Sequence, residues 1–265
     1  MRWALGLEYD GSAYHGWQSQ SALALNTLQS QVEQALSGIA AHPVQVVCGG
    51  RTDRGVHATG QVIHFDSTAD RKVSVWIAGT NHLLPADIRV LWAHEVDPEF
   101  HARYSAHARR YLYVIYNFPL RPALLRRQVT WIPYAIEVAQ MQLAANFLLG
   151  EHDFSAFRGA HCQAKTAVRR IEYITVQRQG DFVVIDVQAN AFLHHMVRNI
   201  TGVLLAVGAS RREPQWVAEV LQGRDRKLAG VTAPANGLYL AHISYSAQWG
   251  LPVAKGAGGI LSLPH

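Results

Sequence analysis

The sequence is short of cysteine and of long hydrophobic runs, and each shortage excludes a class of protein. Its 265 residues include two cysteines, too few for a disulfide framework or a cysteine-based zinc site, so a reducing compartment is expected. Apolar runs such as residues 203–207 are far shorter than the roughly 20 residues that cross a bilayer. Glu8 and Asp10 interrupt any signal-peptide core near the N-terminus. The sequence therefore predicts a cytoplasmic protein with no membrane partner.

The common motifs of nucleotide, redox and hydrolytic enzymes are also missing. The sequence contains no phosphate-binding P-loop, no glycine-rich dinucleotide fingerprint, no nucleophile-elbow serine and no zinc-protease motif. Nucleotide hydrolysis, dinucleotide redox chemistry and zinc-dependent hydrolysis therefore have no support in the sequence.

Lysine is scarce, whereas arginine is abundant. Only four of the 24 basic residues are lysines, and the net charge is +5. A guanidinium group can bind a phosphate through two hydrogen bonds and can stack on a base. Arginine pairs recur at residues 109–110, 126–127, 169–170 and 211–212. This composition favours a polyanionic partner such as nucleic acid, although a general preference for arginine over lysine would produce the same counts.

Hydrophobic periodicity predicts the order strand, helix, strand, strand, helix, strand in the first half of the chain. The predicted elements are residues 2–9, 26–39, 44–48, 60–65, 73–84 and 88–96. Asn26 is expected to cap the first helix, and Pro43 to stop it.

The second half repeats this order. Its predicted elements are residues 109–116, 136–149, 168–178, 182–190, 192–207, a short extra helix at 214–221, and 238–245. Each half is then a βαββαβ unit, as in ferredoxin-like and RRM-like sheets. We expect an α+β fold with two such subdomains, residues 1–104 and 105–249. Their antiparallel sheets would pack side by side around a central active-site cleft, and residues 250–265 would form an irregular tail.

The most specific chemical pattern lies in the glycine-rich turn at residues 49–58. It places Asp53 between Arg51 and Arg54, between two predicted strands. Nearby positive charges favour the ionised form of a carboxylate. An ionised carboxylate is suited to nucleophilic attack or electrostatic stabilisation rather than to proton donation. Taken alone, an R-x-D-R pattern is more often a solvated turn that carries a surface salt bridge, and only the flanking sequence favours a chemical role.

A second pattern places Tyr111 directly after two arginines, Arg109 and Arg110, on a predicted strand. On an open sheet face, a tyrosine can stack on a base while neighbouring arginines hold phosphates. Tyr113 shares that face, so both tyrosines could instead pack in the core.

The third pattern is Arg198 on an otherwise apolar predicted helix. A buried arginine needs a partner, and Asp53 is one candidate, while Asp186 or a backbone carbonyl is the alternative. His194 and His195 precede Arg198. Adjacent histidines on a helix point to different faces, so they are expected to be poor paired metal ligands.

These patterns together resemble the TruA family of tRNA pseudouridine synthases. The matching blocks are residues 50–58 (GRTDRGVHA) with 60–62 (GQV), 110–113 (RYLY) and 192–199 (FLHHMVRN). Weaker blocks lie at 154–157 and 237–239, and the resemblance extends over about residues 5–245.

The resemblance implies an isomerase that forms pseudouridine on the 3′ side of the tRNA anticodon stem-loop, at about positions 38–40. The family works without cofactor or metal, as a homodimer whose subunits both contact the tRNA. The resemblance assigns Asp53 as the catalytic carboxylate and Tyr111 as the residue that stacks on the target uracil. It assigns Arg198 as the partner of that aspartate, and Arg51 as a contact to the flipped nucleotide or its phosphate.

The assigned chemistry agrees with the residues, and two other functions stay open. An anionic carboxylate near C1′ can add to the ribose or stabilise charge as uracil departs, while attack at uracil C6 is the rival route. A non-catalytic RRM-type RNA-binding module is the first alternative, although such sheets display several aromatic residues. A nucleoside or glycoside hydrolase is the second, although its usual second carboxylate is missing from the motif.

Overall fold

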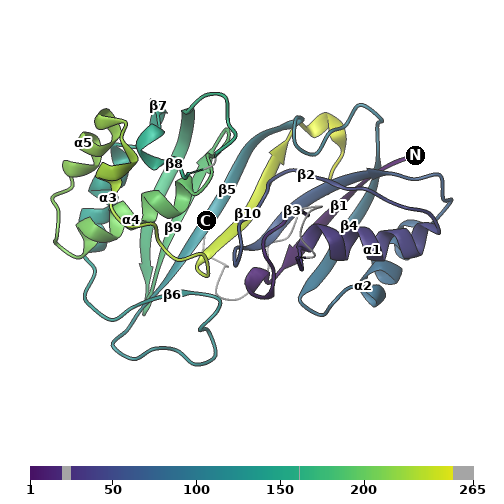
Figure 1. Cartoon of the computed structure of the whole chain (residues 1–265), viewed down its shortest axis with the longest axis horizontal. Helices are drawn as coiled ribbons and strands as arrows, with labels where there is room; N and C mark the ends of the chain where they lie inside the picture. The colour runs from purple at the N-terminus through teal and green to yellow at the C-terminus, as the bar shows by residue number, and fades with distance from the viewer. Residues whose placement is uncertain (20–24, 161, 253–265) are drawn as a thin grey trace. The chain divides into compact units, whose positions relative to one another are not determined.

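The computed structural model of the chain describes residues 1–19, 25–160 and 162–252 (Figure 1). These residues form two compact units. The first comprises Met1–His107 together with the chain from Tyr239, and the second comprises Ala108–Leu238. The domain limits predicted from the sequence stay a prediction, and most of the predicted tail lies outside the described residues.

The first unit follows the predicted order of elements. They are β1 (Arg2–Tyr9), α1 (Leu28–Ala40), β2 (Val47–Cys48), β3 (His57–Asp66), a π-helical turn (Val75–Gly79) that continues into α2 (Thr80–Leu83), and β4 (Ile88–Val96). Strand β1 pairs antiparallel with β3 and β4, and β2 pairs antiparallel with β3. The last strand, β10 (Leu238–Tyr245), pairs in parallel with β3.

The amphipathic pattern of α1 explains its position, although its cap is not the predicted residue. Leu28, Val32 and Leu36 recur at helical spacing and are fully buried. Thr27 is the N-cap, because its side-chain oxygen accepts a hydrogen bond from the Ser30 amide at 3.3 Å. The prediction that Asn26 caps this helix is therefore wrong by one residue.

The second unit contains more strands than predicted. Its elements are β5 (Ala106–Asn117), β6 (Thr130–Ile132), α3 (Val138–Asn146), β7 (Gly150–Asp153), β8 (Val168–Gln179), β9 (Phe182–Ala189), α4 (Met196–Gly208) and α5 (Trp216–Gly223). The sheet runs β5-β9-β8-β7 with antiparallel pairing, and β6 pairs in parallel with β5. Strands β6 and β7 are too short to show a hydrophobic period.

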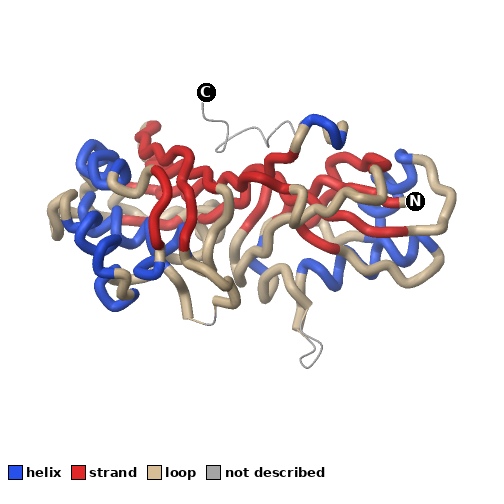
Figure 2. The backbone as a smooth tube through the Cα atoms, turned by 90° about the horizontal axis from the view of Figure 1, so that it is seen from above, coloured by secondary structure: helices blue, strands red, loops and turns tan. Residues whose placement is uncertain are grey.

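Both units are mixtures of helix and mostly antiparallel strand, as the predicted α+β class requires. In each unit the strands form a layer and the α-helices lie mainly on one side of it (Figure 2). The ferredoxin-like architecture of each half stays a prediction. None of the helices in the described ranges combines the length and hydrophobicity that a bilayer crossing requires.

The core of the first unit contains a histidine with an altered pKa. His64 lies on β3 and is 5% exposed, and its Nδ1 accepts a hydrogen bond from the Ala102 amide at 3.1 Å. Burial lowers the pKa of His64 to about 4, and the nearby charges of His101 and Arg2 act in the same direction. The folded state therefore holds this side chain neutral.

We expect the protein to lose stability as the pH falls from about 6.5 towards 4, partly because of His64. In that window the unfolded chain, with a histidine pKa of about 6.5, binds a proton that the folded state excludes. Urea unfolding at pH 7 and pH 5 measures how much the free energy of unfolding falls between the two pH values. We expect this fall to be about 1–2 kcal/mol smaller in His64→Gln than in the wild type. Equal pH dependence in the two proteins would show that His64 does not carry this effect.

Candidate active site

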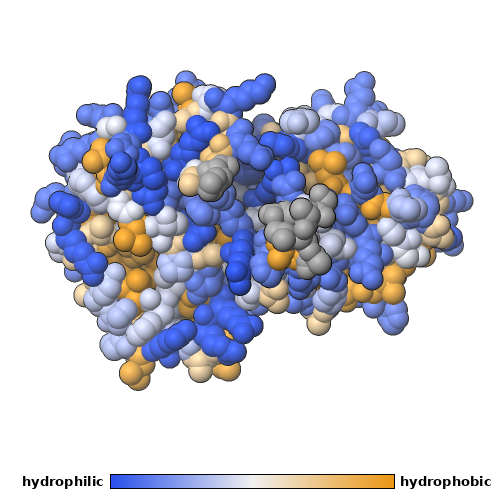
Figure 3. Space-filling view, viewed as in Figure 1, coloured by the Kyte–Doolittle hydropathy of each residue, from blue (hydrophilic) through white to orange (hydrophobic). Residues whose placement is uncertain are grey.

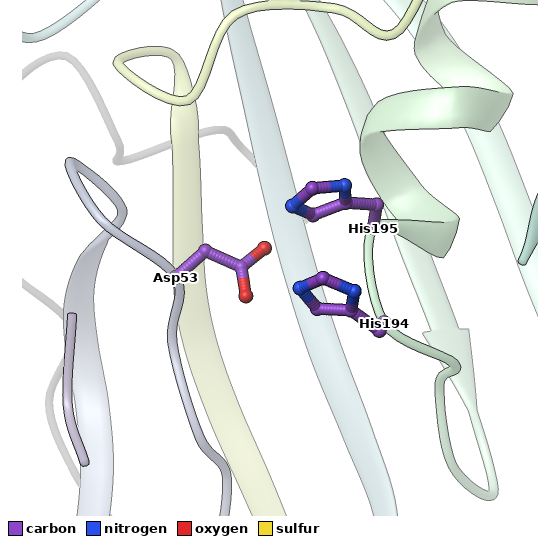
Figure 4. A group of neighbouring side chains, drawn as sticks. All are labelled: Asp53, His194 and His195. Carbon is purple, nitrogen blue, oxygen red and sulfur yellow. The ribbon is translucent and has the colours of Figure 1, made fainter. Parts of the chain in front are cut away.

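Asp53 lies in the loop between β2 and β3, where its side chain projects from the backbone (Figure 4). Its backbone carbonyl accepts a hydrogen bond from the Val56 amide at 3.1 Å, which closes a tight turn. Gly55 adopts a φ of 78°, which a glycine adopts without strain. Arg51 and Arg54 are exposed on the same loop. The structure thus places Asp53 and Arg51 in the first unit, on one short turn.

A buried hydrogen-bond network holds this loop on the side before Asp53. The hydroxyl groups of Thr52 and Tyr9 are 2.8 Å apart, and the Gln61 amide donates to the Tyr9 hydroxyl at 3.3 Å. Gln61 is fully buried and its Oε1 accepts from the Gly50 amide at 3.2 Å. The Thr52 carbonyl accepts from the Trp17 amide at 2.9 Å. The backbone that carries Asp53 is therefore held from several directions.

A second cluster holds the loop on the side after Asp53. His57, at the start of β3, is 2% exposed and lies 3.1 Å from the Asp10 carboxylate. Its ring stacks on Tyr239 of β10, with centroids 4.7 Å apart. Burial opposes ionisation of Asp10, but hydrogen bonds from His57 and Ser12 outweigh it and lower the pKa of Asp10. The position of His57 in the motif predicted nothing about Asp10, because the two residues are distant in sequence.

The Tyr9 hydroxyl is expected to contribute measurably to the stability of this loop. Tyr9→Phe keeps the ring but removes the group that bonds both Thr52 and Gln61, which leaves buried polar atoms short of a partner. We expect the free energy of unfolding to fall by about 1–3 kcal/mol. Tyr104→Phe is the control, because Tyr104 is 75% exposed and its change should stay within about 0.5 kcal/mol. Urea unfolding measures the free energy of unfolding of both variants. An equally small change in the two would show that the Tyr9 hydroxyl does not stabilise the loop.

Tyr111 is less accessible than an open sheet face would make it. It lies on β5 opposite Val187 of β9 and is only 8% exposed. Its ring meets Phe192 edge to face, with centroids 5.0 Å apart and planes at 82°. This contact fixes the orientation of the ring. Tyr113 is fully buried, and its hydroxyl donates to the Pro234 carbonyl at 2.8 Å, so it is a core residue.

Arg198 has a backbone carbonyl as one partner. Its Nε donates to the Ala233 carbonyl oxygen at 2.8 Å, which is one of the expected alternatives. Asp186, the other alternative, binds Arg110 through both carboxylate oxygens, at 2.9 and 2.7 Å. Hydrogen bonding to Asp186 raises the pKa of Arg110. Arg198 and Tyr111 lie in the second unit, and the pairing of Arg198 with Asp53 of the first unit stays a prediction.

The two histidines before α4 are arranged differently from the prediction. Their imidazole rings are stacked, with centroids 3.9 Å apart and planes at 27° (Figure 4). His195 has a left-handed backbone with a φ of 60°, and α4 begins only at Met196. The prediction that the rings point to different faces is wrong, because both residues precede the helix. The expectation that no metal binds then rests on the family resemblance alone.

Comparison with known proteins identifies the class of protein. Residues 7–105 and 144–246 match the sequence model of a family described as tRNA pseudouridine synthase. The tRNA pseudouridine synthase A of Coxiella burnetii (strain Dugway 5J108-111) is 55% identical over 251 residues, which cover 95% of each chain. The enzyme of the same name from Tolumonas auensis is 53% identical over 252 residues, covering 95% of this chain and 96% of its own. That from Vibrio cholerae is also 53% identical, over 95% of each chain.

The chain belongs to the tRNA pseudouridine synthase family, and it is an isomerase that modifies tRNA. The predicted resemblance is thereby confirmed. A solved structure, the archaeal box H/ACA sRNP Nop10–Cbf5 complex, matches 77% of this chain and 44% of its own. With a TM-score of 0.37 and 11% identity, that likeness is too weak to support an argument.

Proposed function

We propose that this protein forms pseudouridine on the 3′ side of the tRNA anticodon stem-loop, in the cytoplasm, with Asp53 as the catalytic carboxylate. The observation that carries the proposal is the identity of 51–55% over 95% of the chain to enzymes named tRNA pseudouridine synthase A. The position of Asp53 supports its role, because a catalytic group must be held within a narrow range of geometry. Thr52 and Gln61 on one side, and His57 on the other, supply that support.

The reaction moves one bond and one proton. The uridine leaves its stack, the N1–C1′ bond breaks, the uracil turns, and a C5–C1′ bond forms. The hydrogen on C5 then departs as a proton and N1 gains one, so substrate and product have the same composition. Asp53 either adds to C1′ and is later displaced by C5, or adds to uracil C6, carries the base as it turns, and leaves C6 once the C5–C1′ bond has formed. Either route uses an ionised carboxylate.

The other assigned residues have roles that their positions support. The Tyr111 ring, oriented by Phe192, would stack on the flipped uracil. Arg198, held through its Nε by the Ala233 carbonyl, would pair with the carboxylate of Asp53. Arg51 is exposed next to that carboxylate in the sequence and would hold the phosphate of the flipped nucleotide. We further propose that a homodimer binds the tRNA across both subunits.

Release of tritium from a tRNA transcript that contains [5-³H]uridine tests this function. Replacement of C5–H by C5–C1′ must release the label to water, and the uracil must stay attached. We expect tritium release that approaches one equivalent for each modified uridine, without free uracil. Release of free uracil would favour a hydrolase, and binding without any release would favour a non-catalytic RNA-binding module.

The affinity for tRNA is expected to fall steeply as the salt concentration rises. Each arginine that contacts a phosphate displaces counterions, so the slope of log affinity against log salt reports the number of such contacts. With three or more contacts, filter binding should show at least about a tenfold loss of affinity between 50 and 200 mM salt. A flat response would argue against phosphate contacts by the arginine pairs.

A further inference from the structure

The second unit contains a pocket of about 610 Å³ that none of the assigned site residues lines. It lies beside α4 and α5, and its apolar lining includes Leu205, Trp216 and Val231. The volume is within the range of about 300–1,000 Å³ that is typical of ligand sites. On the side of the molecule that carries α4 and α5, hydrophobic residues lie within a mainly hydrophilic surface (Figure 3). The pocket can therefore receive a partly apolar group.

Three cations also line this pocket, namely Arg211, Arg212 and Lys227. All three are exposed, and within the described part of the chain none of them forms an ion pair. The Arg211 guanidinium lies 5.0 Å from the centroid of Tyr134, and that of Arg212 lies 5.2 Å from Trp216. Such cation–π contacts orient a guanidinium group and leave its charge available to an anion.

The wall of the pocket at residues 230–234 is fixed on α4. A Cβ on Gly202 would lie 1.9 Å from the Val231 carbonyl oxygen, so the two backbones are in close contact there. The Thr232 hydroxyl donates to the Asn199 side chain at 2.6 Å, and the Ala233 amide donates to the Arg198 carbonyl at 3.1 Å. The pocket is thus preformed, and its wall is bonded to the residue proposed to pair with Asp53.

We propose that this pocket binds one nucleotide of the RNA substrate, at a position away from the target uridine. The base or ribose would contact the apolar lining, and the flanking phosphates would bind the three cations. A purely apolar ligand would leave these charges unused, and inorganic phosphate would leave the apolar lining unused. The inference rests on the proposed function for the identity of the RNA, which is the unmodified tRNA.

The double variant Arg211→Gln/Arg212→Gln tests the proposal. We expect the KM for tRNA in the tritium assay to rise about tenfold with kcat unchanged. The slope of log affinity against log salt should fall by an amount that corresponds to about two phosphate contacts. Lys72→Gln/Arg89→Gln is the matched control, because it removes the same charge from exposed positions in the first unit. An unchanged KM and an unchanged salt slope in the pocket variant would overturn the proposal.

A second variant covers the case in which the double substitution disturbs folding. Val231 is 82% exposed, so Val231→Glu should fold normally while it adds a negative charge to the pocket. We expect it to weaken tRNA binding about tenfold, whereas wild-type affinity would overturn the proposal. Filter binding tests this even if the wild type proves inactive, which separates failure of the subsite from failure of the proposed function.

Titration with uridine 5′-monophosphate alone shows whether the pocket binds a nucleotide of the tRNA or a free nucleotide. Because a single nucleotide has few phosphate contacts, we expect binding only at millimolar concentration, lost in Arg211→Gln/Arg212→Gln. Micromolar binding of the mononucleotide, combined with an unchanged KM for tRNA in that variant, would assign the pocket to a free nucleotide and overturn the proposal.

Discussion

Asp53→Asn is expected to lower turnover by at least about a thousandfold while the affinity for tRNA changes little. The substitution keeps the size of the side chain but removes the negative charge that either proposed route requires. The loop around it should stay in place, because it is held by Thr52, Gln61 and His57 rather than by the Asp53 carboxylate alone. The effect should therefore fall on kcat and leave the folded structure intact.

Asp70→Asn is the matched control for that result. Asp70 is an exposed carboxylate of the same unit, and its loss should leave turnover unchanged. Tritium release under single-turnover conditions measures the chemical step, and filter binding measures affinity. Near-wild-type turnover in Asp53→Asn would remove Asp53 from the mechanism, whatever the control shows.

Tyr111→Ala is expected to lose at least about a hundredfold in turnover, far more than its loss of stability explains. Removal of the ring takes away the proposed stacking surface for the flipped uracil, and stacking on one base contributes about 1–3 kcal/mol. Tyr111 is only 8% exposed and packs on Phe192, so truncation also destabilises the unit by about 3 kcal/mol. Turnover must therefore be measured at a temperature at which the variant is folded.

Two further variants separate a role in the site from a role in the core. Tyr111→Phe keeps the ring and should retain most of the turnover. Tyr113→Phe removes a buried hydroxyl that bonds Thr130 and the Pro234 carbonyl, so it should lose stability but keep turnover in the folded molecules. If the activity of Tyr111→Ala instead follows its folded fraction, Tyr111 is a core residue like Tyr113.

Local patterns were sufficient to predict most regular elements. The predicted strands at residues 88–96 and 238–245 coincide with β4 and β10, because alternation along the chain is a local property. Backbone geometry that depends on one residue was not predictable in the same way. Thr27 rather than Asn26 caps α1, and the left-handed backbone of His195 delays the start of α4. Periodicity carries no information on either feature.

The residues of the candidate site could be proposed from the sequence, but the contacts that hold them in place could not. The motif places Asp53 on a turn because its glycines and charged residues are contiguous in the sequence. The contact of Thr52 with Tyr9 spans 43 residues, and that of Gln61 with Tyr9 spans 52. These contacts arise only when β1 and β3 pair, so no local pattern indicates them. The same holds for the pocket beside α4, which combines Tyr134 with residues more than 60 positions later in the sequence.

The most direct test of the central claim is to map pseudouridine in unmodified tRNA transcripts after treatment with the purified protein, by carbodiimide labelling and primer extension. We expect new stops on the 3′ side of the anticodon stem-loop with the wild type, and none with Asp53→Asn. Stops of equal strength with both proteins would contradict the assignment of Asp53, and stops only elsewhere in the tRNA would contradict the proposed target.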